Sequence, residues 1–134
     1  MNSTAHKILL VDDNLTTIYL NKQLFTRADN SIELLTAPDG KKALEILQKL
    51  VAEGNSLPNV IVVDLKMPVM DGIEFYRQFK NTFTEQQIAE TKVVMLTTSL
   101  AQIDLKRATE EGIDHYLNKP LTVDKIQATI LITE

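Results

Sequence analysis

The chain lacks cysteine and tryptophan, and none of its apolar runs is longer than Ile8–Val11 or Val60–Val63. Without cysteine, the protein forms no disulfide, thiolate metal site or cysteine nucleophile. The short apolar runs argue against a membrane span or a signal peptide. A net charge of −4 provides no basic surface for nucleic acid or for an anionic membrane. We therefore expect a soluble cytoplasmic domain that binds neither.

Five short apolar segments predict β-strands, because they are too short for helices and mostly rich in valine, isoleucine or leucine. They lie at 7–11, 32–36, 60–64, 92–97 and 115–117. Between and after them, apolar residues recur with the period of a helix at 14–27, 40–53, 72–80, 101–111 and 122–132. This alternation predicts an α/β domain, with a parallel sheet and helices on both of its faces. The continuous apolar strands fit burial on both faces.

Two of the predicted helices carry clear apolar stripes. In the first, the stripe contains Leu15, Ile18, Tyr19, Lys22 and Phe25. In the last, it contains Val123, Ile126 and Ile130.

Polar side chains stand where four of the predicted strands end. Asp12 and Asp13 follow the first strand, Asp64 ends the third, Thr97 ends the fourth, and Lys119 follows the fifth. The carboxyl ends of parallel strands meet at one edge of a sheet, where ligands of open α/β folds bind. We therefore expect these five side chains to share one pocket.

The chemistry of such a pocket points to a divalent cation and a phosphoryl group. Two like unit charges about 4 Å apart cost about 4 kcal/mol at an effective dielectric of about 20. Mg²⁺ relieves that repulsion and often bridges carboxylates to phosphate oxygens. Lys119 and Thr97 are suited to hold further oxygens of the same anion. A carboxylate can itself be the nucleophile, and Asp64 ends a rigid buried strand.

Four motifs in this order carry a family resemblance: "VDD" (11–13), "VDLKMPVMDG" (63–72), "LTT" (96–98) and "YLNKP" (116–120). Together, over about residues 6–130, they resemble the receiver domain of two-component response regulators. The resemblance implies a flavodoxin-like fold, a doubly wound five-stranded parallel sheet in the order 2-1-3-4-5. It also implies a single receiver domain over residues 1–134, without an output domain.

The resemblance implies a phosphoacceptor and a metal site. Asp64 would accept a phosphoryl group from a histidine kinase or a histidine phosphotransfer protein. Asp13 and Asp64 would bind Mg²⁺, together with the backbone carbonyl of Lys66, and Asp12 would act mainly through a metal-bound water. Lys119 would pair with the phosphoryl group. The protein would be a signalling domain rather than an enzyme, catalysing only its own phosphorylation and dephosphorylation.

The resemblance also implies a switch that ends at a downstream protein target. Thr97 would move towards the phosphoryl group, and Tyr116 would change rotamer in response. The peptide bond between Lys119 and Pro120 would be cis.

Three features depart from the common pattern of the family. Lys66 stands two places after Asp64, where many receivers carry a neutral residue, and its side chain can reach over a phosphoryl group. Thr98 stands where a smaller residue is usual, and its larger side chain narrows the access to the pocket. The segment 81–92 is longer than the usual link, so we expect either a longer helix or a surface excursion. Asp71 is expected to be structural, at the entry of a helix.

Other functions fit the residues less well. A phosphohydrolase of the haloacid dehalogenase type needs a second acid two places after the nucleophile, and Lys66 stands there. A flavodoxin needs a hydroxyl- and glycine-rich phosphate loop after the first strand, where this chain has Asp12 and Asp13. A degenerate receiver that only binds partners would lack part of the acid set, and none of it is missing.

The end of the chain suggests a contact surface. Successive helical residues point about 100° apart, so Ile130, Leu131 and Ile132 cannot all face the sheet. We expect Ile130 to do so, which leaves Leu131 or Ile132 partly exposed near Tyr116. An exposed apolar side chain on this face predicts a weak homodimer.

Overall fold

The computed structural model describes residues 3–4, 7–98, 102–113 and 115–133 of the chain. His6, the first residue of the expected core, and Ala101, the first of the fourth predicted helix, lie outside the described residues. Within the described ranges, no helix combines the length and the apolar character needed to cross a membrane.

Five parallel strands form the central sheet, as the alternation of segments predicts. They are β2 (Lys7–Val11), β3 (Glu33–Ala37), β4 (Val60–Asp64), β5 (Lys92–Thr97) and β6 (Tyr116–Asn118). Their order is β3-β2-β4-β5-β6, which is the expected 2-1-3-4-5 arrangement of the flavodoxin-like fold. The register pairs Val11 with Val63 and Asp64 with Leu96, so the carboxyl ends of the central strands are aligned.

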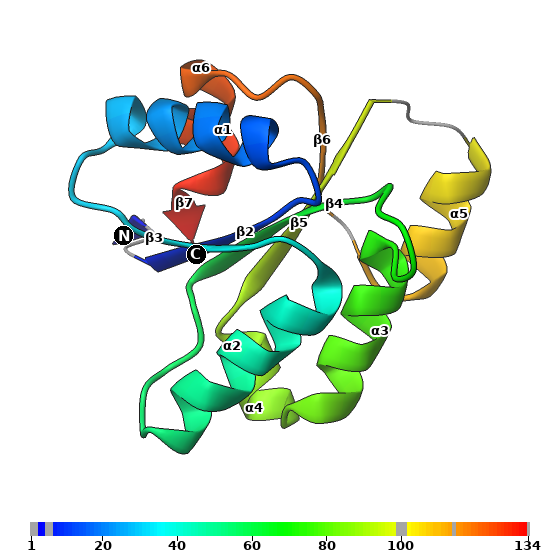
Figure 1. Cartoon of the computed structure of the whole chain (residues 1–134). Coiled ribbons are helices and arrows are strands. Elements are labelled where there is room, and N and C mark those ends of the chain that lie inside the picture. The colour runs from blue at the N-terminus through cyan, green and yellow to red at the C-terminus, as the bar shows by residue number, and fades with distance from the viewer. Residues whose placement is uncertain (1–2, 5–6, 99–101, 114, 134) are drawn as a thin grey trace.

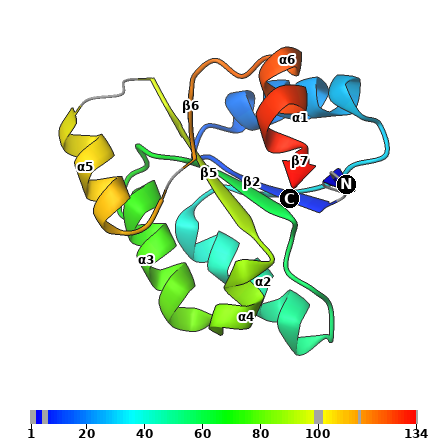
Figure 2. The same ribbon diagram turned by 180° about the vertical axis from the view of Figure 1, so that it is seen from behind.

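Helices cover both faces of the sheet (Figures 1 and 2). One face carries α1 (Leu15–Ala28), α6 (Val123–Lys125) and the π-helix η1 (Ile126–Ile130). The other carries α2 (Gly40–Ala52), α3 (Gly72–Thr82), α4 (Glu85–Ala89) and α5 (Gln102–Glu110). Alternate residues of β4 enter the two cores, Val60 and Val62 on the α1 side and Ile61 and Val63 on the α3 side. Burial on both faces explains why this strand is apolar without interruption.

Helix α1 uses its predicted stripe only in part. Ile18 and Phe25 are buried, but Leu15 and Tyr19 are 71% and 61% exposed. Asn21, a polar residue that is not part of the predicted stripe, is buried instead. The helix is therefore rotated so that part of its apolar surface faces solvent.

In the segment 81–92 we expected either a longer helix or a surface excursion, and the structure has a longer α3 followed by a separate short helix. Helix α3 continues to Thr82, and α4 follows as a separate short helix. A capping box begins α4, because the Thr84 side chain accepts from the Gln87 backbone while the Gln87 side chain accepts from the Thr84 backbone. Ile88 packs against the main core, which holds α4 to the domain.

The last helix corrects our prediction for the contact surface. After Lys125 the backbone widens into a π-helix, and the Leu131 N–H donates to the Ile126 carbonyl five residues earlier. That spacing brings Ile126 and Leu131 onto one face, so Leu131 is buried against the α1 side of the sheet. Tyr116 packs with the core of the opposite face. Of the two residues expected to be partly exposed, Leu131 is therefore buried, whereas Ile132 is 37% exposed. The weak homodimer stays a prediction.

Two short strands join the first and last described segments. β1 (Ser3–Thr4) pairs antiparallel with β7 (Ile132–Thr133), and the two termini lie close together (Figure 1). The Lys92 ammonium donates to the carbonyls of Thr129 and Ile132. These two hydrogen bonds hold the backbone of residues 129–132 against β5.

Candidate functional site

The predicted polar residues lie at one edge of the sheet, because the carboxyl ends of the central strands are aligned. Asp12 and Asp13 follow β2, and Asp64 is the last residue of β4. Asn14 is the N-cap of α1, where its side chain accepts from the Thr17 N–H. Because Asn14 takes the capping role, the two preceding acids are left for the pocket.

Three carboxylates meet in this pocket, as the sequence predicts. One oxygen each from Asp12, Asp13 and Asp64 lies within 4.8 Å of the others. Asp12 is 1% exposed and Asp64 is 6% exposed, while Asp13 faces solvent. The pocket is therefore open on one side and has two of its charges in the protein interior.

Lys119 is the cation of the pocket. Its ammonium lies 3.0 Å from Asp64 Oδ2 and 3.7 Å from Asp12 Oδ2. Burial raises the pKa of the Asp64 carboxyl, the Lys119 ammonium opposes that shift, and the nearby Asp12 charge adds to it. One ammonium thus compensates only part of the negative charge.

The remaining charge fits a hard cation. Asp12 Oδ1 accepts from the Asn14 N–H, but Asp12 Oδ2 is buried and has no hydrogen-bond partner among the described residues. Buried polar atoms without partners are rare in proteins, and each calls for an explanation such as a missing ion. An all-oxygen set of carboxylates suits Mg²⁺. Asp12, Asp13 and Asp64 are therefore the residues that could hold the metal.

The turn after Asp64 is held close to the strand that precedes it. The Lys66 N–H donates to Asp64 Oδ1 at 3.3 Å, which fixes one carboxylate oxygen. A side chain at Gly72 would come within 2.8 Å of the Asp64 carbonyl, so only glycine lets α3 begin here. Asp71 caps α3 through the Glu74 N–H, as predicted, and its other oxygen pairs with Arg107 of α5 at 3.1 Å.

Of the two expected switch residues, Thr97 ends β5 and Tyr116 begins the neighbouring strand β6. Thr97 is buried one position beyond Leu96, the partner of Asp64, and its carbonyl accepts from the Lys119 N–H. The Tyr116 hydroxyl donates to the Ile113 carbonyl at 2.6 Å and lies 3.1 Å from the Thr109 hydroxyl. Tyr116 is thus attached to the end of α5 and to the loop that follows. The peptide bond between Lys119 and Pro120 is cis.

The model of the response regulator receiver domain family matches residues 8–131 of this chain. The chain is a response regulator receiver domain. It is 35% identical over 123 residues to the probable methanogenesis regulatory protein FilR2 of Methanothrix harundinacea (strain 6Ac), covering 92% of this chain and 77% of that protein. It is 30% identical to the alkaline phosphatase synthesis transcriptional regulatory protein PhoP of Bacillus subtilis (strain 168), covering 92% of this chain but 46% of PhoP.

Solved receivers have the same fold. A two component response regulator from Cytophaga hutchinsonii is similar with a TM-score of 0.81 at 28% identity, over 93% of each chain. The chemotaxis protein CheY4 of Vibrio cholerae is similar with a TM-score of 0.78 at 29% identity, over 93% of this chain and 95% of that one. The receiver therefore belongs to two-component signalling.

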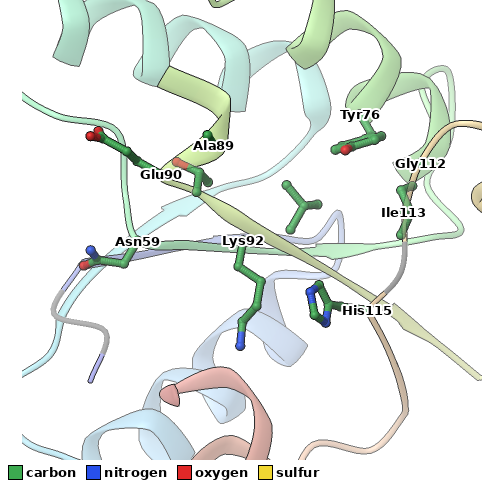
Figure 3. A pocket seen from close by; sticks show the side chains of 10 residues that line it. Asn59, Tyr76, Ala89, Glu90, Lys92, Gly112, Ile113 and His115 are labelled. Carbon is green, nitrogen blue, oxygen red and sulfur yellow. The ribbon is translucent and has the colours of Figure 1, made fainter. Parts of the chain in front are cut away.

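A second pocket of the receiver, of ≈ 260 Å³, lies at the opposite end of β5 (Figure 3). Lys92 and His115 extend to one side of the strand, whereas Tyr76 lies on the other. The Lys92 ammonium is already bound to two carbonyls of the last turn. The labelled polar side chains of this second pocket therefore lie on different sides of β5.

Sequence reasoning missed two features beside the acid pocket. Val69 has a φ of 69° and a fully exposed side chain, in a tight turn closed by the Met70 N–H and the Pro68 carbonyl. A β-branched residue is rare in that conformation, so no propensity scale would have placed it there. The second missed feature is the burial of Asn21. A search for apolar residues at helical spacing cannot find a polar residue that is buried.

Proposed function

We propose that Asp64 is the phosphoacceptor of this receiver, taking a phosphoryl group from a phosphohistidine. The observation that carries the proposal is the placement of the Asp64 carboxylate 3.0 Å from the Lys119 ammonium, at the end of a rigid strand. Lys66 N–H and Lys119 hold the carboxylate in place before any donor arrives. Such pre-positioning favours an in-line attack.

The transfer forms one bond and breaks one. A carboxylate oxygen of Asp64 attacks phosphorus, the new P–O bond forms, and the P–N bond to the donor's histidine breaks. The imidazole leaves as a neutral ring when its other nitrogen already carries a proton. Lys119 pairs with the charge that moves onto the phosphoryl oxygens, and Thr97 donates a hydrogen bond to one of them.

Asp12, Asp13 and Asp64, with the Lys66 carbonyl, are proposed to hold Mg²⁺. When bound, the ion neutralises part of the charge shared by the carboxylates and the phosphoryl oxygens. The orphaned Asp12 Oδ2 supports this assignment. The chain itself is proposed to act as a signalling domain in the cytoplasm and to turn over no other substrate.

Output is proposed to run through Tyr116 and α5 to a downstream protein. Phosphorylation would draw Thr97 towards the phosphoryl group and free space for Tyr116 to change rotamer. The Tyr116 hydroxyl would then leave the Ile113 carbonyl and Thr109. This loosens the attachment of α5 to β6 and changes the surface that a target meets.

The histidine donor is proposed to approach along α1. Leu15, Tyr19 and Leu20 are more than half exposed on this helix, which begins directly after the acid pair. Exposed apolar side chains that gather beside a reactive pocket mark a protein contact. A histidine kinase or a histidine phosphotransfer protein fits this surface.

Labelling with a small phosphodonor tests the proposed function. With Mg²⁺ and acetyl phosphate, intact mass should show one phosphoryl group on the wild-type protein and none on Asp64→Asn, since an amide is a poor nucleophile. Chelation of Mg²⁺ should prevent the labelling. Equal labelling of Asp64→Asn would contradict the assignment of Asp64.

A further inference from the structure

Helix α5 is attached to its neighbour α3 by two groups of ion pairs (Figures 1 and 2). In the first, the Arg107 guanidinium of α5 lies 3.1 Å from Asp71 Oδ2, at the start of α3. In the second, the Glu111 carboxylate lies 2.9 Å from the Arg77 guanidinium and 3.3 Å from the Lys80 ammonium, both on α3. Arg107 and Glu111 are four residues apart, so they point to the same side of α5.

The charges of the two helices are complementary in order. Helix α3 has an acid at its start, Asp71, and two bases in its later turns, Arg77 and Lys80. Helix α5 has the reverse order, with Arg107 followed by Glu111. Each of these charges on the α5 side therefore meets the opposite charge on α3.

The Asp71 end of this attachment is fixed close to the proposed phosphoacceptor. Asp71 Oδ1 accepts from the Glu74 N–H at 2.8 Å, which holds the carboxylate at the start of α3. The next residue, Gly72, packs so closely that a Cβ there would lie 2.8 Å from the Asp64 carbonyl oxygen. Arg107 therefore ties α5 to the backbone that carries Asp64.

The apolar attachment of α5 is small where the structure describes it. Among residues 106–110, whose burial is described, Ala108 is the only buried one, and Ile113 follows in the next loop. The ion pairs therefore supply much of the described attachment. Because they are partly exposed, each is weak and is screened by salt. An attachment of this kind can open at little cost in free energy.

We propose that the α3–α5 ion pairs hold α5 in the position that it has in the unphosphorylated receiver, and that they open when Asp64 is phosphorylated. The inference rests on the proposed function, in which Tyr116 leaves the Thr109 hydroxyl and the Ile113 carbonyl. These two groups stand two residues before and two residues after Glu111. Release at Tyr116 and opening of the ion pairs thus involve the same turn of the chain.

The ion pairs are then a brake on the switch. A ligand or a modification that favours one of two conformations shifts the equilibrium by its difference in free energy between them. If phosphorylation opens the ion pairs, then by linkage their removal makes phosphorylation easier. Ion pairs that only stabilise the surface would matter equally in both states.

Substitutions on α5 test this brake with matched controls. Arg107→Met removes the pair with Asp71, and Glu111→Gln removes the charge that meets Arg77. Lys106→Met and Glu110→Gln make the same changes of charge at exposed neighbouring positions of α5. Asp71 itself is left unchanged, because it caps α3.

Backbone hydrogen exchange of residues 106–113 is measured first, without a phosphodonor. Arg107→Met and Glu111→Gln should each speed the exchange about threefold, and the double variant about tenfold, as the loss of weak ion pairs implies. The two control variants should match wild type. Raising the salt from about 0.05 M to about 0.5 M should speed exchange in wild type and leave the double variant unchanged.

The exchange is then measured with Asp64 labelled by acetyl phosphate and Mg²⁺, with the donor kept in excess. Wild type should now exchange nearly as fast as the double variant, so that the difference between them falls below about twofold. The double variant should also be labelled about twofold to fivefold faster than wild type, and the controls at the wild-type rate.

Two results would overturn the inference. If Arg107→Met and Glu111→Gln exchange no faster than the controls, the ion pairs do not hold α5. If the double variant differs from wild type as much after labelling as before it, they hold α5 in both states and form no brake. A failure of the proposed function looks different, because Asp64 would then be labelled in no variant. That result would overturn the opening by phosphorylation as well, while the exchange without donor would still show whether the ion pairs hold α5.

Discussion

The two ends of strand β5 both border a pocket with charged side chains, but the charges are arranged differently. At the Thr97 end, the Lys119 ammonium lies 3.0 Å from Asp64 Oδ2 and 3.7 Å from Asp12 Oδ2. At the Lys92 end, the ammonium is bound by carbonyls of the last turn, and His115 and Tyr76 lie on opposite sides of the strand (Figure 3).

The proposed site of phosphorylation is thus distinguished by charges that converge, and not by the volume of its pocket. At the Lys92 end, the ammonium donates to two backbone carbonyls of the same chain, although burial lowers its pKa. The charges at the Thr97 end destabilise the fold, since the buried carboxylates repel one another and Asp12 Oδ2 has no hydrogen bond to any described residue. A protein keeps such an arrangement for what it binds.

We expect the largest effect, a loss of Mg²⁺ affinity, when an acid at the Thr97 end of β5 is replaced. Asp13→Ala should weaken Mg²⁺ binding about 100-fold, and Asp12→Ala about tenfold, if Asp12 acts through a metal-bound water as we propose. Without metal, Asp12→Ala should unfold at a higher urea concentration than wild type, since its repulsion with Asp64 is gone. Calorimetric Mg²⁺ titration and urea unfolding measure the two effects. Glu90→Ala, at the other end of β5, is the control, and wild-type Mg²⁺ affinity in both Asp variants would refute a shared site.

We expect a smaller effect, on the lifetime of the phosphorylated protein, when Lys66 beside the acid pocket is replaced. Lys66 is exposed two residues after Asp64, where its ammonium can reach over the phosphoryl group and hinder the attacking water. Lys66→Asn should therefore shorten the lifetime of the phosphorylated protein about threefold to tenfold, which is about 0.7–1.4 kcal/mol in the barrier. The decay is followed by intact mass after removal of the donor. A lifetime equal to or longer than that of wild type would show that Lys66 does not protect the phosphoryl group.

The smallest effect on phosphorylation should come from the Lys92 end. Lys92→Met keeps the length of the side chain but leaves the carbonyls of Thr129 and Ile132 without their donor. We expect labelling of Asp64 within about twofold of wild type and a free energy of unfolding lower by about 1–2 kcal/mol. Lys49→Met, at an exposed site on α2, is the control for loss of charge. If Lys92→Met abolished labelling, the two ends would be coupled and the contrast between them would fail.

Much of the sheet could be predicted from the sequence, because each central strand is an apolar run with sharp polar ends. β2, β4 and β5 have the predicted bounds, and the five polar residues at the strand ends follow from the parallel topology. The convergence of Asp12, Asp13 and Asp64 was likewise a consequence of sequence order and sheet direction.

The features that escaped prediction depend on geometry that a periodic pattern does not contain. A π-turn changes the angular spacing of residues, so the assumed 100° could not show that Leu131 is buried and that Ile132 is the exposed one of the two. The rotation of α1, which exposes Leu15 and buries Asn21, is decided by packing against η1 and α6 rather than by its own stripe. Strands of two residues, such as β1 and β7, are too short to show any period.

The central claim, that Asp64 carries the phosphoryl group, is tested most directly by trapping the modified side chain. Borohydride reduces an aspartyl phosphate to homoserine, and peptide mass spectrometry then locates the converted residue. After labelling with acetyl phosphate and Mg²⁺, homoserine should appear at position 64 and at neither Asp12 nor Asp13, and Asp64→Asn should give none. Homoserine at position 12 or 13, or its absence from a protein whose intact mass shows the phosphoryl group, would contradict the account.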